Sequence, residues 1–176
     1  MTTSRQSVAQ ASNFSRTFSR TLLTSALALS LTLAGTGERA FAFDQATLIG
    51  LNNDGVRASN QQNYPLAIQK LEEAMKMDPT YKKARDNLSV AYNNYGGSFK
   101  NNPTEAIKLF HKAAMLDPTN PITLGNLASI IKVMGKDPNN FATRVALGDA
   151  CRKAADFAGA IVEYREALKL KDDPKT

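Results

Sequence analysis

The most constraining feature of this chain is a helix-length stretch that occurs three times. It reads YPLAIQKLEEAMKMDPTY at 64–81, NPTEAIKLFHKAAMLDPTN at 102–120 and DFAGAIVEYREALKLKDDP at 156–174. Each copy has Ala-Ile, then a bulky residue, then Ala, and the bulky residues are Leu71, Phe110 and Tyr164. A unit of this size cannot bury its own apolar face, so successive units must stack. The repeat therefore predicts an array of stacked units.

The first 42 residues have the order of a secretory signal peptide. Residues 1–20 contain Arg but no acidic residue, residues 21–34 form an apolar run, and residues 40–42 read Ala-Phe-Ala. The apolar run is shorter than the roughly 20 residues of a membrane-spanning helix. We therefore expect cleavage after Ala42, no stable membrane span afterwards, and a periplasmic or secreted location. An uncleaved membrane anchor and import into an organelle lumen are the alternatives.

Helical periodicity covers the chain from residue 46 onwards, and no stretch has the alternation of a strand. The pattern predicts about seven helices joined by short turns. We expect them over 46–62, 65–77, 81–95, 104–116, 121–134, 141–154 and 157–170. The first is polar and weak in helix propensity, because it contains Gly50 and Gly55. Gly96 and Gly97 are expected to end the third.

The residues at these positions resemble the tetratricopeptide repeat family, whose unit is a helix–turn–helix of about 34 residues. The matching positions are Leu51, Gly55, Ala58, Ala67, Leu71 and Pro79; Leu88, Tyr92, Ala106, Phe110 and Pro118; and Leu147, Gly148, Cys151, Ala160 and Tyr164. The resemblance implies an all-α, right-handed α-solenoid of antiparallel helix pairs. Its units are about 48–81, 82–120 and 141–174, with an extra half-unit at 121–140. The chain departs from the pattern at Asp54 and Asp172, where an apolar residue and Pro are usual.

The resemblance also implies a concave groove, lined by the first helix of each unit, that binds a peptide or a partner protein. The candidate groove residues are Asn52, Asn60, Lys83, Asn87, Asn94, Asn126, Lys132, Arg152 and Lys153. Asn side chains carry both donors and acceptors and can hold an extended peptide backbone, while Lys and Arg can hold a carboxylate. The ordinary alternative is that each of these residues is simply solvated.

Charge and residue types argue against other classes of function. The formal net charge is +6, and it falls to +3 (18 basic against 15 acidic residues) without residues 1–42. Charges of both signs are mixed along the chain, so we expect no nucleic-acid partner. His111 and Cys151 are the only residues of their types. We expect His111 to be solvated on an outer helix face and Cys151 to be a buried small hydrophobe, with no metal, cofactor or catalytic site.

The sequence therefore favours a non-catalytic scaffold or adaptor for protein–protein interactions in an exported compartment. The alternative is a self-associating structural subunit of a larger envelope or secretion assembly. No capping helix follows Leu170 in the sequence, and terminal repeats usually need one. A homo-oligomer formed through the last helix would cover the apolar surface that such an end exposes.

Overall fold

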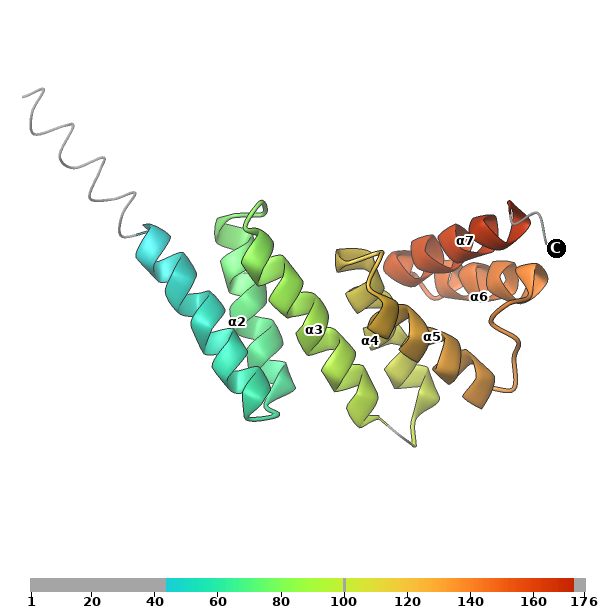
Figure 1. The fold of residues 1–176 in the computed structure, drawn as a ribbon, viewed down its shortest axis with the longest axis horizontal. Coiled ribbons are helices and arrows are strands. Elements are labelled where there is room, and N and C mark those ends of the chain that lie inside the picture. The colour runs from blue at the N-terminus through green and yellow to red at the C-terminus, as the bar shows by residue number, and fades with distance from the viewer. Residues whose placement is uncertain (1–43, 100, 173–176) are drawn as a thin grey trace, which may run out of the picture. The chain divides into compact units, whose positions relative to one another are not determined.

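The computed structural model describes residues 44–99 and 101–172, so the predicted signal segment 1–42 lies outside the described residues. Within these ranges the chain forms seven helices and no strand, which confirms the all-α fold. Of the described residues, those from Leu48 to Asp172 form one compact unit (Figure 1). In the part that the structure describes, no helix combines the length and the apolar character needed to cross a membrane.

Most helices begin at a polar cap that the sequence supplies. Residues 44–60 are helical, and the other helices are α2 (Tyr64–Met77), α3 (Lys82–Ser98), α4 (Pro103–Leu116), α5 (Pro121–Val133), α6 (Phe141–Lys153) and α7 (Phe157–Lys171). The residues before five of them accept a hydrogen bond from a first-turn backbone N–H through their side chains: Asn63, Asn102, Asn120, Asn140 and Asp156. Such caps satisfy backbone donors that have no partner within the helix.

The helix predicted over 46–62 is confirmed as a continuous helix over residues 44–60, despite its weak propensity. The predicted end of the third helix is wrong, because α3 does not end at Gly96 but continues through Ser98. A side chain on Gly96 would lie only 2.8 Å from the Phe110 ring, so this glycine allows α3 and α4 to approach closely. The packing of Phe110 therefore outweighs a helix-propensity penalty of about 1 kcal/mol.

The bulky residue of each repeat packs against a glycine of the preceding helix. A Cβ atom added to Gly55 would lie 2.5 Å from Leu71, and one added to Gly148 would lie 2.6 Å from Tyr164. Gly96 and Phe110 form the third such pair. The Ala residues on either side are buried: Ala67, Ala74, Ala106, Ala113, Ala160 and Ala167. This confirms that the repeated pattern spaces one helix against the next, with a small residue opposite each large one.

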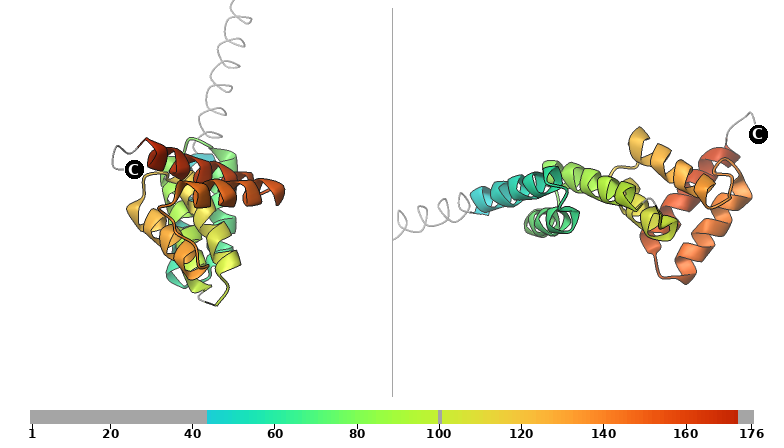
Figure 2. Two further views of the ribbon diagram at one scale, coloured as in Figure 1. Left: turned by 90° about the vertical axis from the view of Figure 1, so that its right-hand side faces the viewer. Right: turned by 90° about the horizontal axis from the view of Figure 1, so that it is seen from below.

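Helix α4 is the centre of the packing. Helices α2, α3 and α4 pack in succession, α5 and α7 both pack on α4, and α6 packs on α7 (Figures 1 and 2). One apolar cluster contains Ala113 of α4, and a second contains Ile107 and Phe110 of α4 together with residues of α5, α6 and α7. Among the described helices, α5 and α6 share no extensive interface. The extra half-unit, through α5, therefore pairs with α4, and α6 pairs with α7.

The close approach at Gly55 gives a stability test within one helix. We expect Gly55→Ala to destabilise the protein by about 1–3 kcal/mol, because the new methyl group overlaps Leu71 and the Ala67 carbonyl. Gly50→Ala is the matched control, since no atom lies within 4 Å of its Cβ position. That change should stabilise the helix by about 0.5–1 kcal/mol. Urea denaturation followed by circular dichroism measures both, and equal effects of the two substitutions would contradict the packing.

Candidate functional site

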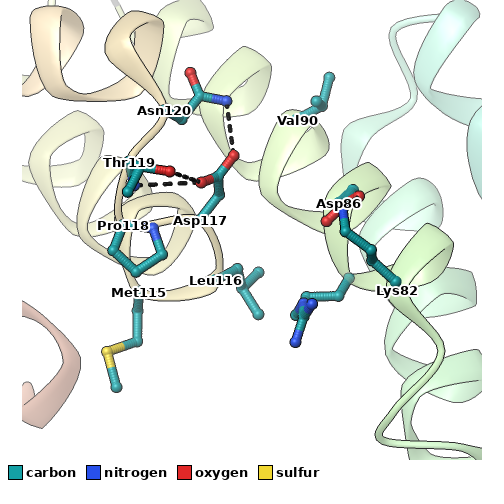
Figure 3. A pocket seen from close by; sticks show the side chains of 10 residues that line it. Lys82, Asp86, Val90, Met115, Leu116, Asp117, Pro118, Thr119 and Asn120 are labelled. Carbon is teal, nitrogen blue, oxygen red and sulfur yellow. Dashed lines mark hydrogen bonds and ion pairs between the residues drawn. The ribbon is translucent and has the colours of Figure 1, made fainter.

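One pocket lies between the first half of α3 and the turn that joins α4 to α5, with a volume of about 790 Å³ (Figure 3). Three of its four charged side chains have partners. Lys82 forms an ion pair with Asp86, and the Asp117 carboxylate accepts hydrogen bonds from Thr119 and Asn120 at 3.2–3.3 Å. The Asp117 interactions stabilise the turn itself, and the fourth charged side chain of the lining is Arg85.

A second pocket, of about 500 Å³, lies at the other end of α3 and is rich in side-chain amides. It is lined by Gln62, Tyr64, Asn93, Asn94, Gly97, Ser98 and Asn126. The Asn126 amide of α5 donates a hydrogen bond to Asn93 of α3 at 2.9 Å, which fixes the two helices against each other. The exposed Asn94 lies beside this pair. The pocket thus holds amide donors and acceptors from two helices at one place.

A smaller apolar pocket of about 170 Å³ adjoins the amide pocket and shares Gly97 and Asn126 with it. The remaining lining residues are Gly96, Phe99, Ala106, Phe110, Ser129, Ile130 and Val133. The rings of Tyr64, Tyr95 and Phe99 form a row beside it, with centroid separations of 5.8 and 5.0 Å. We call the two adjoining pockets together the α3–α5 groove. A polar surface and an apolar hollow therefore lie side by side.

The structure brings some of the predicted groove residues together and separates others. Asn94 and Asn126 lie in the α3–α5 groove. Asn52 is buried, and its side-chain amide oxygen accepts a hydrogen bond from the Asn87 side-chain amide at 2.9 Å, so this pair joins two helices. The exposed candidates outside the groove lining are Asn60, Lys83, Lys132, Arg152 and Lys153. The last two lie on α6, which packs on α7.

Several residues that line the groove were not predicted from the sequence. Asn93 was missed, although it immediately precedes the predicted Asn94. Ile130 was missed as well, although it lies one helical turn after the predicted Asn126 on α5. The signal for Ile130 and Val133 was their apolar character on an otherwise polar face. Val133 is 67% exposed, although an apolar side chain of this kind is usually buried.

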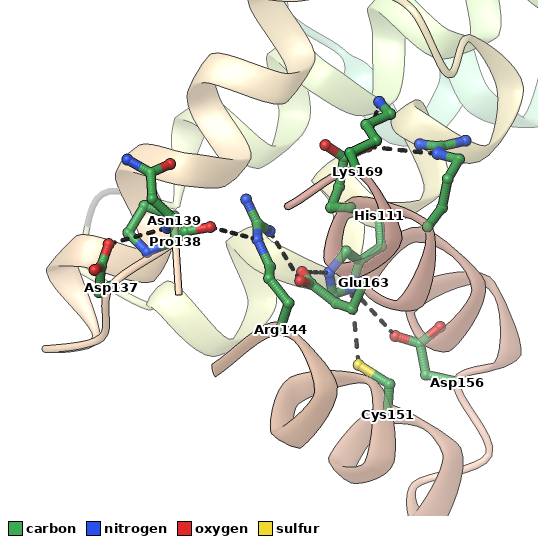
Figure 4. A network of polar contacts seen from close by, with 11 residues as sticks. His111, Asp137, Pro138, Asn139, Arg144, Cys151, Asp156, Glu163 and Lys169 are labelled. Carbon is green, nitrogen blue, oxygen red and sulfur yellow. Dashed lines mark hydrogen bonds and ion pairs between the residues drawn. The ribbon is translucent and has the colours of Figure 1, made fainter. Parts of the chain in front are cut away.

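The prediction for His111 was wrong, because this residue is fully buried in a network of charged side chains (Figure 4). Its Nε2 atom lies 2.7 Å from the Glu163 carboxylate of α7. The other oxygen of Glu163 accepts a hydrogen bond from the Arg144 guanidinium of α6 at 2.8 Å, and Arg144 also donates to the Pro138 carbonyl at 2.8 Å. Glu163 is fully buried, and Arg144 is 6% exposed. The network therefore joins α4, α6 and α7.

Hydrogen-bond partners, more than burial, set the protonation states of His111 and Glu163 in this network. Burial by itself would lower the pKa of His111, but hydrogen bonds to Asp156, Cys151 and Glu163 outweigh burial and raise it to about 10. Burial likewise raises the pKa of Glu163, but hydrogen bonds from His111 and Arg144 more than compensate, and the pKa is lowered. Glu163 is thus an ionised acceptor between two cationic groups.

The other ring nitrogen of His111 faces two potential metal ligands. Nδ1 lies 3.6 Å from an Asp156 carboxylate oxygen and 4.0 Å from the Cys151 sulfur. Asp156 and Cys151 are both half-buried. These three residues offer a nitrogen, an oxygen and a sulfur atom, all within 4.8 Å of one another. Cys151 is therefore not simply a small buried hydrophobe, as the sequence suggested.

The position of α7 explains why the sequence did not indicate this cluster. In a regular array the face of α4 that carries His111 points away from the next unit, so a solvated histidine was expected. Here α7 packs on α4 and covers that face. The partners Arg144 and Glu163 lie 33 and 52 residues further along the chain, so no local spacing links the three.

Comparisons with protein-family models and with curated protein sequences found no match to this chain. The candidate site consists of an amide-rich groove that adjoins an apolar hollow, and a separate buried charged cluster joins α4, α6 and α7.

Loss of one charge from the buried network should be costly. We expect Glu163→Gln to destabilise the protein by about 3 kcal/mol, because the Arg144 guanidinium then has no counter-charge in the interior. Glu73→Gln is the control: Glu73 pairs with Lys70 at the surface of α2, where the loss of one ion pair should leave the stability almost unchanged. Urea midpoints measured at neutral pH check both variants. A Glu163→Gln protein as stable as the control would contradict the role given to this carboxylate.

Proposed function

We propose that the chain is a tetratricopeptide-like, non-catalytic scaffold of an exported compartment, which binds an extended segment of a partner protein in the α3–α5 groove. The observation that carries this proposal is the position of the amide pocket directly beside the apolar pocket. An extended peptide presents backbone amides at regular intervals and side chains on alternating sides. The groove offers a surface for each of these features.

The amide side chains suit the backbone of such a peptide. Asn93, Asn94 and Asn126 each carry one acceptor and one double donor. Only part of this capacity is used in the Asn126–Asn93 hydrogen bond, so further donors and acceptors are available to a ligand. The same bond holds the amides in place, which reduces the entropy lost when a ligand binds.

The apolar hollow suits one side chain of the peptide. Its floor contains Phe110 and Ile130, and the exposed Val133 lies at its edge. A Leu, Ile, Met or Phe side chain that enters it would transfer apolar area from water on both partners, which is worth roughly 1.5–3 kcal/mol for a fully buried side chain. The preferred ligand is therefore an extended segment with one apolar anchor residue.

A random peptide library displayed on phage and selected against the full chain tests this proposal. We expect selected peptides to share an apolar anchor. Asn126→Ala should weaken their binding about tenfold, the value of one lost hydrogen bond, and Val133→Asp should weaken it at least as much, because a charge then borders the hollow. Matched controls are Asn139→Ala and Ile122→Asp, at exposed residues outside the groove. Selection of no peptide, or of peptides insensitive to both groove substitutions, would overturn the proposal.

A second candidate function is self-association through α7, and one observation favours it. Phe157, Ile161 and Leu168 are 66%, 49% and 57% exposed. Their spacing places them along one side of α7, opposite the buried face that contains Glu163. The same apolar stripe on a second copy of the chain would complement it, as in a symmetric dimer.

Sedimentation velocity over a range of protein concentrations separates the two candidates. Self-association predicts that the mean mass rises with concentration and that Ile161→Asp combined with Leu168→Asp restores the monomer. Ile122→Asp, at an exposed apolar residue of α5, should leave the assembly intact. A wild-type chain that remains monomeric at every concentration would exclude this candidate, and the peptide-binding proposal would be unaffected.

A further inference from the structure

We propose that His111, Cys151 and Asp156 form a binding site for a zinc ion. The site lies where α4, the end of α6 and the start of α7 meet, and it is distinct from the α3–α5 groove. It would take a divalent, thiol-binding metal ion through one nitrogen, one sulfur and one oxygen atom.

The three ligand atoms already lie close to the spacing that zinc requires. Zinc bonds of about 2.0–2.3 Å in tetrahedral geometry place neighbouring ligand atoms about 3.3–3.8 Å apart. Nδ1 of His111 is 3.6 Å from the Asp156 oxygen and 4.0 Å from the Cys151 sulfur, and no pair of these atoms is more than 4.8 Å apart. Small side-chain rotations of Cys151 and Asp156, which are both half-buried, would close the remaining difference.

The surroundings of His111 match those of a metal-binding histidine. Such a residue usually donates its second ring N–H to a carboxylate, which fixes the orientation of the ring. Glu163 occupies this position, 2.7 Å from Nε2, and Arg144 holds Glu163 in turn. Nδ1 is thereby directed towards Cys151 and Asp156. In the ion-free network Nδ1 carries a proton that points towards Asp156, and a bound zinc ion would displace this proton and take its place.

Gly159 keeps the space beside the proposed ligands open. A Cβ atom at this position would lie 2.4 Å from the Asp156 oxygen and 2.6 Å from Nδ1 of His111. Any other residue would therefore push these two ligands apart. The second oxygen of Asp156 accepts a hydrogen bond from the Gly159 backbone N–H at 3.0 Å, which leaves the first oxygen directed at the histidine.

The ligand types favour zinc over the other common divalent ions. Mg²⁺ and Ca²⁺ are bound through oxygen atoms alone, whereas zinc accepts nitrogen, sulfur and oxygen together. Three protein ligands leave a fourth position for water. The Asp156 side chain is 26% exposed, so the ion could enter from that side. A substrate would need a pocket, and the pockets along α3 are lined by other residues, which argues for an ion and against a cysteine nucleophile.

The test uses the full chain after treatment with a chelator. Zinc uptake is measured by equilibrium dialysis and metal analysis, and Co²⁺ is used as a spectroscopic probe. We expect one Zn²⁺ per chain, and a Co²⁺ spectrum with a thiolate-to-metal charge-transfer band that is absent from Cys151→Ser. Asp156→Asn and Gly159→Ala should each lower the zinc affinity at least about tenfold, and excess Mg²⁺ should not compete. Asp149→Asn, which changes a carboxylate elsewhere on α6, should bind as the wild type does.

Circular dichroism confirms that each variant remains folded, and the wild-type Co²⁺ spectrum decides the question without any variant. Absence of the charge-transfer band in the wild-type protein would overturn the site. Zinc binding that is unchanged in both Cys151→Ser and Asp156→Asn would do so as well. A loss of binding in Gly159→Ala, with every ligand still present, would support the geometry specifically.

Discussion

The Glu163 carboxylate is the contact on which the second half of the structure depends. It is fully buried and lies between the imidazole of His111 and the guanidinium of Arg144. An ionised carboxylate in the interior is tolerated only when it is paired and hydrogen-bonded, so its two partners must lie where they do. Because they belong to α4 and α6, one side chain of α7 fixes the relative positions of three helices. Apolar packing alone, which is non-directional, would determine these positions less strictly.

This constraint separates two faces with different chemistry. On one side, α3 and α5 are held by the hydrogen bond between Asn93 and Asn126, and the face between them remains open to solvent. On the other, α7 covers α4 and encloses a charged cluster. The same helix α4 supports both, since Phe110 forms the floor of the apolar hollow and His111 is the next residue. Adjacent residues of one helix thus serve an external and an internal site.

The sequence predicted the helices and their pairing within each repeat, because both depend on local signals. Asn and Pro at helix starts act within one turn, and the spacing of small and large residues along each repeated helix, such as Ala67, Leu71 and Ala74, acts over two turns. It did not predict the end of α3, because the fit of Gly96 to Phe110 is a tertiary contact. It predicted Asn94 and Asn126 as groove residues from their helix positions. It placed Arg152 and Lys153 in the same groove, which assumed that α6 follows α5 regularly.

His111 shows most clearly what sequence reasoning could not reach. The repeat pattern places it on an outer face, and only the return of α7 onto α4 buries it. Arg144 and Glu163 did not indicate a buried ion network, since charged residues such as these are ordinary on surface helices. The burial of His111 depends on how three helices pack together, and the periodicity of any one helix does not predict it.

The packing of both α5 and α7 on α4 has a consequence for how the array could grow. A regular solenoid is translationally periodic, so a unit can be duplicated at any position without changing its neighbours. Here the periodicity is interrupted at α4, whose surface is shared by two different helices. A duplicated unit placed before α3 would meet the same interfaces that already exist, whereas one placed after α4 would have to displace α7 and expose the buried charges. The array can therefore be lengthened only on the N-terminal side of α4. Lengthening on the other side would expose the buried charges of Glu163 and Arg144, which is energetically costly.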